Sequence, residues 1–166
     1  MKYSVYWIFI SVFCCSCQQG DKTNHIAIRE GTSIDTFRQL TSFPLLIKNV
    51  HWSIETHENK SGRSIPGPSD WSLFGEIKSD STEVKRLKDA MEKGNNVISK
   101  EIYVDPKYYK GWLSTCLKGH FVKKDSFMIL KSNIYKIDKK IFPVMSKNGW
   151  FTIIDNDIIF VVLSSS

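Results

Sequence analysis

Two apolar stretches near the end of the chain, residues 150–154 and 158–163, constrain its fold more than any other feature of the sequence. Asp155, Asn156 and Asp157 separate them, and residues of this kind favour a tight turn, which predicts a β-hairpin. The second stretch, Ile-Ile-Phe-Val-Val-Leu, is apolar at every position, as is typical of a strand at the centre of a sheet. Because it is too short to cross a bilayer, we expect it inside a globular β-sheet.

The middle of the sequence predicts a second pair of strands. Apolar and polar residues alternate from 50 to 57, which is the pattern of a half-buried strand. Residues 59–70 have the glycine and proline content of a loop, and residues 71–77 resume a strand that can pair antiparallel with the first. Strand-like patterns also occupy 127–137 and 141–145, and residues 26–28 could add a short edge strand.

The clearest helix signal covers residues 80–94. Asp80 can cap the helix, Glu83 stands three residues later as in a capping box, and Gly94 supplies the terminating residue. Val84, Leu87 and Met91 then line one face of the helix, which predicts the side that packs against the sheet.

Two further helices are expected. A short one begins after Thr32 or Ser33 and ends at Phe43-Pro44. The other begins at Asp105-Pro106 and stops at Gly119, with Gly111 as a weak point inside it. Its apolar face would hold Tyr109, Trp112, Leu113 and Cys116.

Composition and the element order together indicate one domain. The chain has 166 residues, 42% of them hydrophobic and 24% charged, which suits a single globular core. We expect an α+β domain over residues 32–166, with a largely antiparallel sheet and two or three helices packed on one face. The formal net charge of +6 is scattered along the chain, so nucleic acid is not an expected partner.

The N-terminus has the layout of a secretory signal peptide. An apolar run follows Lys2, and the cluster Cys14-Cys15-Ser16-Cys17 ends it before a polar segment. Ser16-Cys17, a small residue before a cysteine, resembles the lipobox of bacterial lipoproteins. This resemblance covers residues 1 to about 21 and implies removal of residues 1–16, lipidation of Cys17 and a tether over residues 17–31. It places the body in the bacterial cell envelope, held on a membrane by acyl chains such as palmitate.

The lipobox pattern leaves two matters open. Cys14 occupies the third position before cleavage, where the family usually has leucine, and inner and outer membrane are equally compatible with the pattern. An ordinary signal peptide with incidental cysteines is the alternative. After cleavage Cys116 would be the one free thiol of the body, so no internal disulfide is expected.

The loop over residues 63–71, called here the Pro-rich loop, is the first candidate binding feature. Its prolines stiffen the backbone, and its arginine, aspartate and tryptophan are residue types that anchor protein interfaces. The candidate residues are Arg63, Pro66, Pro68, Asp70 and Trp71. The same composition also fits a rigid connection with Trp71 turned into the core. Tyr108, Tyr109 and Trp112 raise the same choice between an aromatic platform and simple packing.

Two weaker patterns could carry chemistry. His51, Glu55 and His57 share one strand face and could hold a metal if His120 or Asp70 joined them, but the polar, solvated side of a half-buried strand is the favoured explanation. Cys116 and His120 stand four apart, as in a thiol nucleophile, yet Cys116 lies on the apolar stripe of its expected helix.

No known catalytic or cofactor-binding motif occurs in the sequence. GxSxG, P-loop, GxGxxG and HExxH patterns are all missing, so we expect no catalytic residue and no cofactor. The leading hypothesis is a lipid-anchored, non-enzymatic lipoprotein of the binding, inhibitory or immunity type, whose partner is an envelope protein or polymer. The alternative is a metal-dependent envelope hydrolase that uses His51, Glu55 and His57.

Overall fold

The computed structural model describes residues 25–58, 70–137 and 148–164. The expected signal peptide, Cys17 and the first part of the tether lie outside these residues, as do the predicted strand 141–145 and most of the Pro-rich loop, including Arg63, Pro66 and Pro68.

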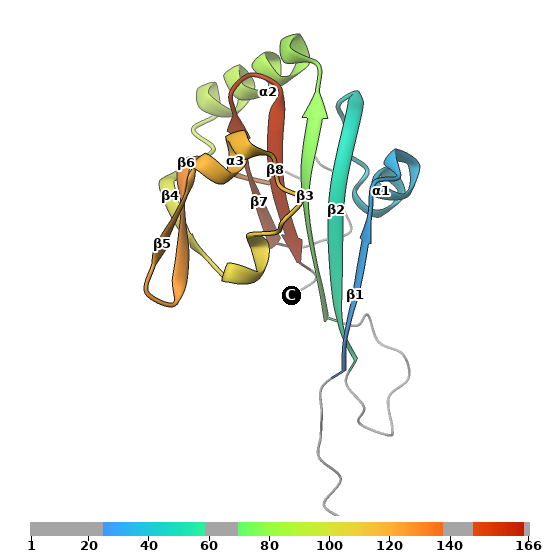
Figure 1. The fold of residues 1–166 in the computed structure, drawn as a ribbon. Coiled ribbons are helices and arrows are strands. Elements are labelled where there is room, and N and C mark those ends of the chain that lie inside the picture. Colours follow the sequence, from blue (N-terminus) through green and yellow to red (C-terminus); the bar gives the residue numbers. More distant parts are fainter. Residues whose placement is uncertain (1–24, 59–69, 138–147, 165–166) are drawn as a thin grey trace, which may run out of the picture.

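An antiparallel sheet of eight strands forms the body of the described chain (Figure 1). The main path runs in the order β1-β2-β3-β8-β7-β6-β4, and β5 pairs with β6 beside this path. The strands are β1 (His25–Gly31), β2 (Ile47–Glu58), β3 (Asp70–Ser79), β4 (Val97–Val104), β5 (Phe121–Lys124), β6 (Phe127–Lys136), β7 (Asn148–Ile154) and β8 (Ile158–Ser164). The expectation of a largely antiparallel sheet is confirmed.

Strand β8 is central, as its apolar sequence predicts. It stands fourth along the path, between β3 and β7, and pairs antiparallel with both. Side chains alternate across a strand, so Ile159, Val161 and Leu163 face one core cluster while Phe160 and Val162 face the other. The β7–β8 hairpin is also confirmed, and Asp155 adopts a φ of 52° in its turn.

The two faces of the sheet are covered by different helices. Helices α1 (Ile34–Thr41) and α2 (Ser81–Lys93) contribute Phe37, Val84, Leu87 and Met91 to the first cluster. The short helix α3 (Thr115–Gly119) contributes Leu117 to the second, on the opposite face. Two helices therefore share one face as expected, while the third does not. Within the described residues, none of the helices is both long and apolar enough to cross a bilayer.

The predicted strand pair at residues 50–57 and 71–77 is confirmed. Strands β2 and β3 run antiparallel through a long register from Ile47↔Ser79 to His57↔Asp70. The predicted edge strand at 26–28 also forms, as the longer strand β1, which pairs with β2. Strand β1 occupies the last seven residues of the stretch expected as a tether.

Helix α2 forms as predicted, but its capping box does not. The Asp80 side chain accepts a hydrogen bond from the Thr82 backbone amide at 2.9 Å, so Asp80 is the cap. Glu83 does not turn back to Asp80. Its carboxylate instead accepts from the Leu46 backbone amide at 2.9 Å, where it satisfies the amide just before β2. Glu83 therefore makes a contact with a distant part of the chain instead of the expected capping contact within α2.

The prediction of one helix over residues 105–119 is wrong. The structure has a 3-10 turn, η1 (Pro106–Tyr108), and a separate α3 that begins after Ser114. Ser114 caps α3 by accepting from the Leu117 amide at 3.2 Å, so a new helix starts where the predicted one should continue. Gly111 lies in the break, because glycine disfavours a continuous helix there.

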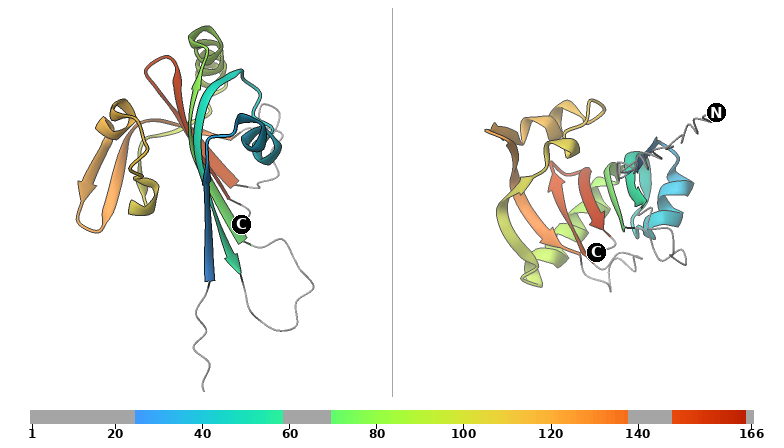
Figure 2. Two further views of the ribbon diagram at one scale, coloured as in Figure 1. Left: turned by 45° about the vertical axis from the view of Figure 1, so that its right-hand side comes forward. Right: turned by 90° about the horizontal axis from the view of Figure 1, so that it is seen from below.

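The far end of the sheet forms an arm made of β4, β5 and β6. The first part of β6, Phe127–Leu130, pairs with β5, whereas its last part, Ile134–Lys136, pairs with β7. Strand β4 runs along the other side of β6. Figures 1 and 2 show this arm splayed away from β1, β2 and β3, with η1 and α3 on the side between them.

Gly31 provides a test of how β1 is joined to the sheet. Gly31 stands opposite Trp52, and a Cβ at this position would lie 2.6 Å from the indole ring, whose Nε1 also donates to the Ser33 carbonyl. Gly31→Ala should therefore lower the free energy of unfolding by about 1–3 kcal/mol in urea titrations. Gly111→Ala is the matched control, since a Cβ there meets nothing within 4 Å, and an equal effect of both changes would contradict this assignment.

Candidate functional site

The candidate site lies where residues 105–120, called here the crossing segment, pass over strands β1, β2 and β3. This segment connects the end of β4 to β5 and contains η1 and α3. Asp105 starts it by accepting a hydrogen bond from the Lys107 amide at 2.9 Å, and Pro106 suits the first position of the turn. Leu113 and Leu117 then anchor the segment in the second core cluster.

The face of β2 and β3 beneath the crossing segment carries many polar residues, and its centre is buried. The register places Asn49 opposite Lys78, His51 opposite Glu76, Ser53 opposite Phe74 and Glu55 opposite Ser72. Residues directly opposite each other share a face of the sheet. The expectation of a solvated polar face is wrong here, because Ser53 is 0% and Glu55 is 4% exposed. The crossing segment covers them.

Glu55 is paired with Lys107 across this interface. Their side chains are 2.9 Å apart, and the Lys107 side chain is 33% exposed. Burial by itself lowers the pKa of Lys107, but the hydrogen bond to Glu55 and the neighbouring negative charges outweigh it, so the pKa is raised. Lys107 is therefore charged at neutral pH. This ion pair fastens η1 to β2.

A second lysine holds the segment to β1. Lys110 lies 3.6 Å from Glu30, and its ammonium stands 5.4 Å from the centre of the Phe74 ring. Phe74 is fully buried and contacts Tyr108 edge to face at 5.0 Å between ring centres. The segment is thus attached by two lysines and by aromatic packing beneath them.

His51 and Trp112 form one wall of an open hollow. Their rings stack at 4.3 Å between centres with 9° between planes. Next to them the Glu76 carboxylate accepts a hydrogen bond from the Ser114 amide at 2.7 Å. The hollow measures about 170 Å³ and is lined by Asn49, Val50, His51, Glu76, Lys78, Trp112 and Ser114. It therefore offers an aromatic stack, a cation and a carboxylate side by side.

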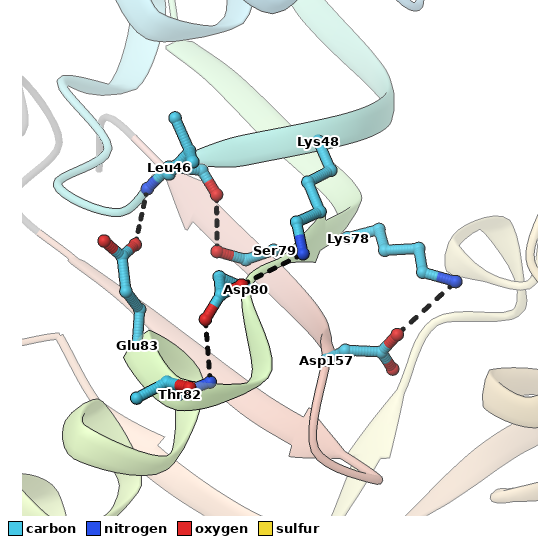
Figure 3. Close-up of polar contacts among 8 residues, drawn as sticks. All are labelled: Leu46, Lys48, Lys78, Ser79, Asp80, Thr82, Glu83 and Asp157. Carbon is cyan, nitrogen blue, oxygen red and sulfur yellow. Dashed lines mark hydrogen bonds and ion pairs between the residues drawn. The ribbon is translucent and has the colours of Figure 1, made fainter.

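Two charged pairs lie at the ends of β2 and β3, and one of them includes Lys78 (Figure 3). Lys78, which lines the hollow, lies 3.4 Å from Asp157 in the β7–β8 turn. Lys48 lies 3.0 Å from Asp80, and its hydrogen bond lowers the pKa of that carboxyl. Both lysine side chains are more than half exposed, so these pairs contribute little to stability and their charges remain accessible to a partner.

Three buried polar groups of the crossing segment and of the strand face beneath it have no hydrogen-bond partner in the part of the chain that the structure describes. They are the Trp112 indole nitrogen and the hydroxyls of Ser53 and Ser72. Buried polar groups in proteins usually do have partners. The face beneath the crossing segment therefore keeps hydrogen-bonding capacity that the described contacts do not use.

The predicted metal ligands are not brought together within the described residues. His51 stacks on Trp112, and Glu55 is bound to Lys107. The His120 ring is bonded to the Lys131 carbonyl at 2.9 Å. No group of three or more metal-ligating side chains occurs among residues 25–58, 70–137 and 148–164. The side chains of His57 and Asp70 lie outside this description, so the metal site stays a prediction.

The thiol of Cys116 donates a hydrogen bond to the Asp155 carboxylate and not to His120. Its sulfur lies 2.7 Å from Asp155 Oδ2. The hydrogen bond to Asp155, followed by burial, raises the pKa of Cys116 to about 11. A thiol with that pKa is protonated at neutral pH, and a protonated thiol is a poor nucleophile. Gly119 ends α3 between Cys116 and His120, as the sequence predicts.

The aromatic residues of the crossing segment mainly pack against other aromatic rings. Tyr109 lies 5.5 Å from Phe121 between ring centres, and Trp112 stacks on Phe74 as well as on His51. Trp71 packs against the first core cluster, which favours a role in packing over a role in binding a partner. Sequence reasoning missed Lys107 and Glu76, because their roles depend on partners 52 and 38 residues away.

The Glu55–Lys107 pair can be tested by a double-mutant cycle. Lys107→Met leaves the Glu55 carboxylate buried without a counter-charge, so we expect the free energy of unfolding to fall by about 2–4 kcal/mol. The double variant Glu55→Met with Lys107→Met removes both charges and should lose less than Lys107→Met alone. Urea titrations at neutral pH measure both effects. A double variant that loses the sum of the two single changes would contradict a direct pair.

Comparisons with models of known protein families, with curated proteins and with solved structures gave no match for this chain. The candidate residues of the site are therefore assigned from geometry and chemistry alone.

Proposed function

We propose that this chain is a lipid-anchored protein of the bacterial cell envelope that binds another envelope protein, in an inhibitory or immunity-type role, without catalysing a reaction. The hollow beside His51 and Trp112 is its contact surface. The acyl chains on Cys17 hold the body on the membrane, and the hollow receives a side chain of the partner.

The size of the hollow carries this proposal. Sites for small-molecule substrates usually enclose about 300–1,000 Å³. A hollow of about 170 Å³ is smaller than that range, and it suits one inserted side chain of a protein partner. The stacked rings of His51 and Trp112 provide a flat apolar contact, while Lys78 and Glu76 supply charges of both signs at its border.

The state of the reactive side chains supports binding over catalysis. Glu55 is neutralised by Lys107, Glu76 accepts from the Ser114 amide, and the Cys116 thiol is bonded to Asp155. Each of these contacts holds the crossing segment on the sheet or on the β7–β8 turn. A catalytic acid, base or nucleophile would have to face a substrate instead.

The sequence supports the membrane anchor. The apolar run before Ser16-Cys17 is too short to span a bilayer, so attachment would depend on acyl chains. Two or more acyl chains attach a protein stably, because each buried methylene contributes about 0.8 kcal/mol.

Mass spectrometry of the protein extracted from membranes tests the anchor. We expect the chain to begin at Cys17 and to carry the added mass of acyl groups there. Cys17→Ser should abolish this mass and leave the leader attached, whereas Cys15→Ser should keep both processing and lipid. An unmodified residue 17 in the unaltered protein, or lipid lost only in the Cys15→Ser control, would contradict the assignment.

Photo-crosslinking in producing cells tests the contact surface. A benzoylphenylalanine at exposed Asn49, beside the hollow, should give one defined protein adduct, and the same group at Arg86 on exposed α2 should not. Lys78→Glu reverses a charge at the border of the hollow and should reduce the adduct about fivefold, because such a change costs about 1 kcal/mol. Arg86→Glu is the matched control. Equal adducts at both positions would contradict this surface.

The metal-dependent hydrolase has a separate test. Elemental analysis of the purified body would have to find a stoichiometric transition metal that is lost with His51→Ala and with His57→Ala. Nothing in the described contacts favours this alternative, since Glu55 is already paired.

A further inference from the structure

An exposed apolar patch lies at the tip of the arm. Phe127 is 55%, Tyr103 57% and Val122 41% exposed, although all three are large hydrophobic residues. Together with Ile129 beneath them they form what is called here the hairpin patch. Apolar groups gathered on an otherwise polar surface usually mark an interaction site.

The strand register shows that these residues share one face. Ile129 of β6 stands opposite Tyr103 of β4 and opposite Val122 of β5. Phe127 precedes Ile129 by two residues, so it points to the same side, and its ring lies 6.5 Å from that of Tyr103. The opposite face of the arm carries Leu130, which is fully buried in the second core cluster. The hairpin patch is therefore the outer face, and the fold itself leaves it uncovered.

Charges of both signs border this patch, since exposed Glu101 stands opposite Lys131, but the hairpin itself carries more lysines than carboxylates. Residues 121–136, the β5–β6 hairpin, contain four lysines against one aspartate. Lys124 stands opposite Phe127, and Lys131 follows Ile129 on the same face. Both lysines are exposed. Aromatic residues next to lysines are typical of surfaces that rest on anionic bilayers, where the rings enter the headgroup region and the ammonium groups meet lipid phosphates.

The position of the patch fits the proposed anchor. Lys124 and Phe127 flank the turn between β5 and β6, so the patch lies at the tip of the hairpin. Figure 1 shows this tip pointing towards the same end of the molecule as the start of β1. Eight residue steps separate Cys17 from His25, and a fully extended chain advances at most about 3.6 Å per residue. The start of β1 therefore stays within about 29 Å of a lipidated Cys17.

We infer that the tip of the β5–β6 hairpin docks on the anionic bilayer that carries the lipid anchor. This inference rests on the proposed lipidation of Cys17. Docking fixes the orientation of the body, with β1 and the hairpin tip towards the membrane.

Fluorescence quenching in vesicles tests the docking. The mature lipidated protein, with Cys116→Ser, would carry a bimane at Ser126→Cys in the hairpin turn or at Arg86→Cys on α2. Both forms would be reconstituted into vesicles that contain phosphatidylglycerol and doxyl-labelled lipid. We expect the label at 126 to be quenched about twofold more than the label at 86. Lys124→Glu combined with Phe127→Ser should remove this difference, and both changes are at exposed positions.

The outcomes separate docking from anchoring. If the protein floats with the vesicles but positions 126 and 86 are quenched equally, the docking inference is overturned while the lipid anchor stands. If the mature chain carries no lipid and does not float, both proposals fall. A label at 126 that is shielded from aqueous iodide yet not quenched by lipid would assign the patch to contact with another copy of this chain and would also overturn the inference.

Discussion

The structure depends on the burial of both faces of β8. A strand with apolar residues at every position cannot lie at an edge or face water on one side, so each face needs its own cover. Helices α1 and α2 cover one face, and the crossing segment with α3 covers the other. The chain must therefore return over the sheet after β4, and this return places Lys107, Lys110 and Trp112 above strands β1 to β3. The candidate site is a consequence of covering the second face.

That second cover differs from the first in chemistry. Beneath α1 and α2 the contacts are apolar, whereas the crossing segment meets a polar face with Glu55, Ser53 and His51. Lys107 provides the counter-charge for Glu55, because an unpaired buried carboxylate would be costly. The same polar contacts leave a small hollow at the edge of the interface, between the stacked His51 and Trp112 and the ends of β2 and β3. The proposed contact surface and the contacts that hold the crossing segment on the sheet thus lie in one interface.

Local signals predicted the elements whose stability is local. Asp80 and Gly94 mark α2, the alternation from Val50 marks β2, and the turn at Asp155 marks the last hairpin. Strand β4 was missed, because its register is interrupted twice by irregularities and its exposed apolar residues show no clean alternation. The helix predicted over 105–119 was wrong for a related reason. Its apolar spacing is real, but those side chains contact Phe74, Phe121 and His51 on other elements instead of packing along one helix face.

The sequence by itself determined the antiparallel sheet, its central strand and two of the helices, because these follow from neighbouring residues or short periods. Only the tertiary structure decided that Glu83 binds Leu46, that Glu55 meets Lys107, and that His51 stacks on Trp112. Each of these contacts joins residues at least 37 positions apart. Their geometry is set by how the crossing segment and α2 lie on the sheet, and no short pattern in the chain contains that information.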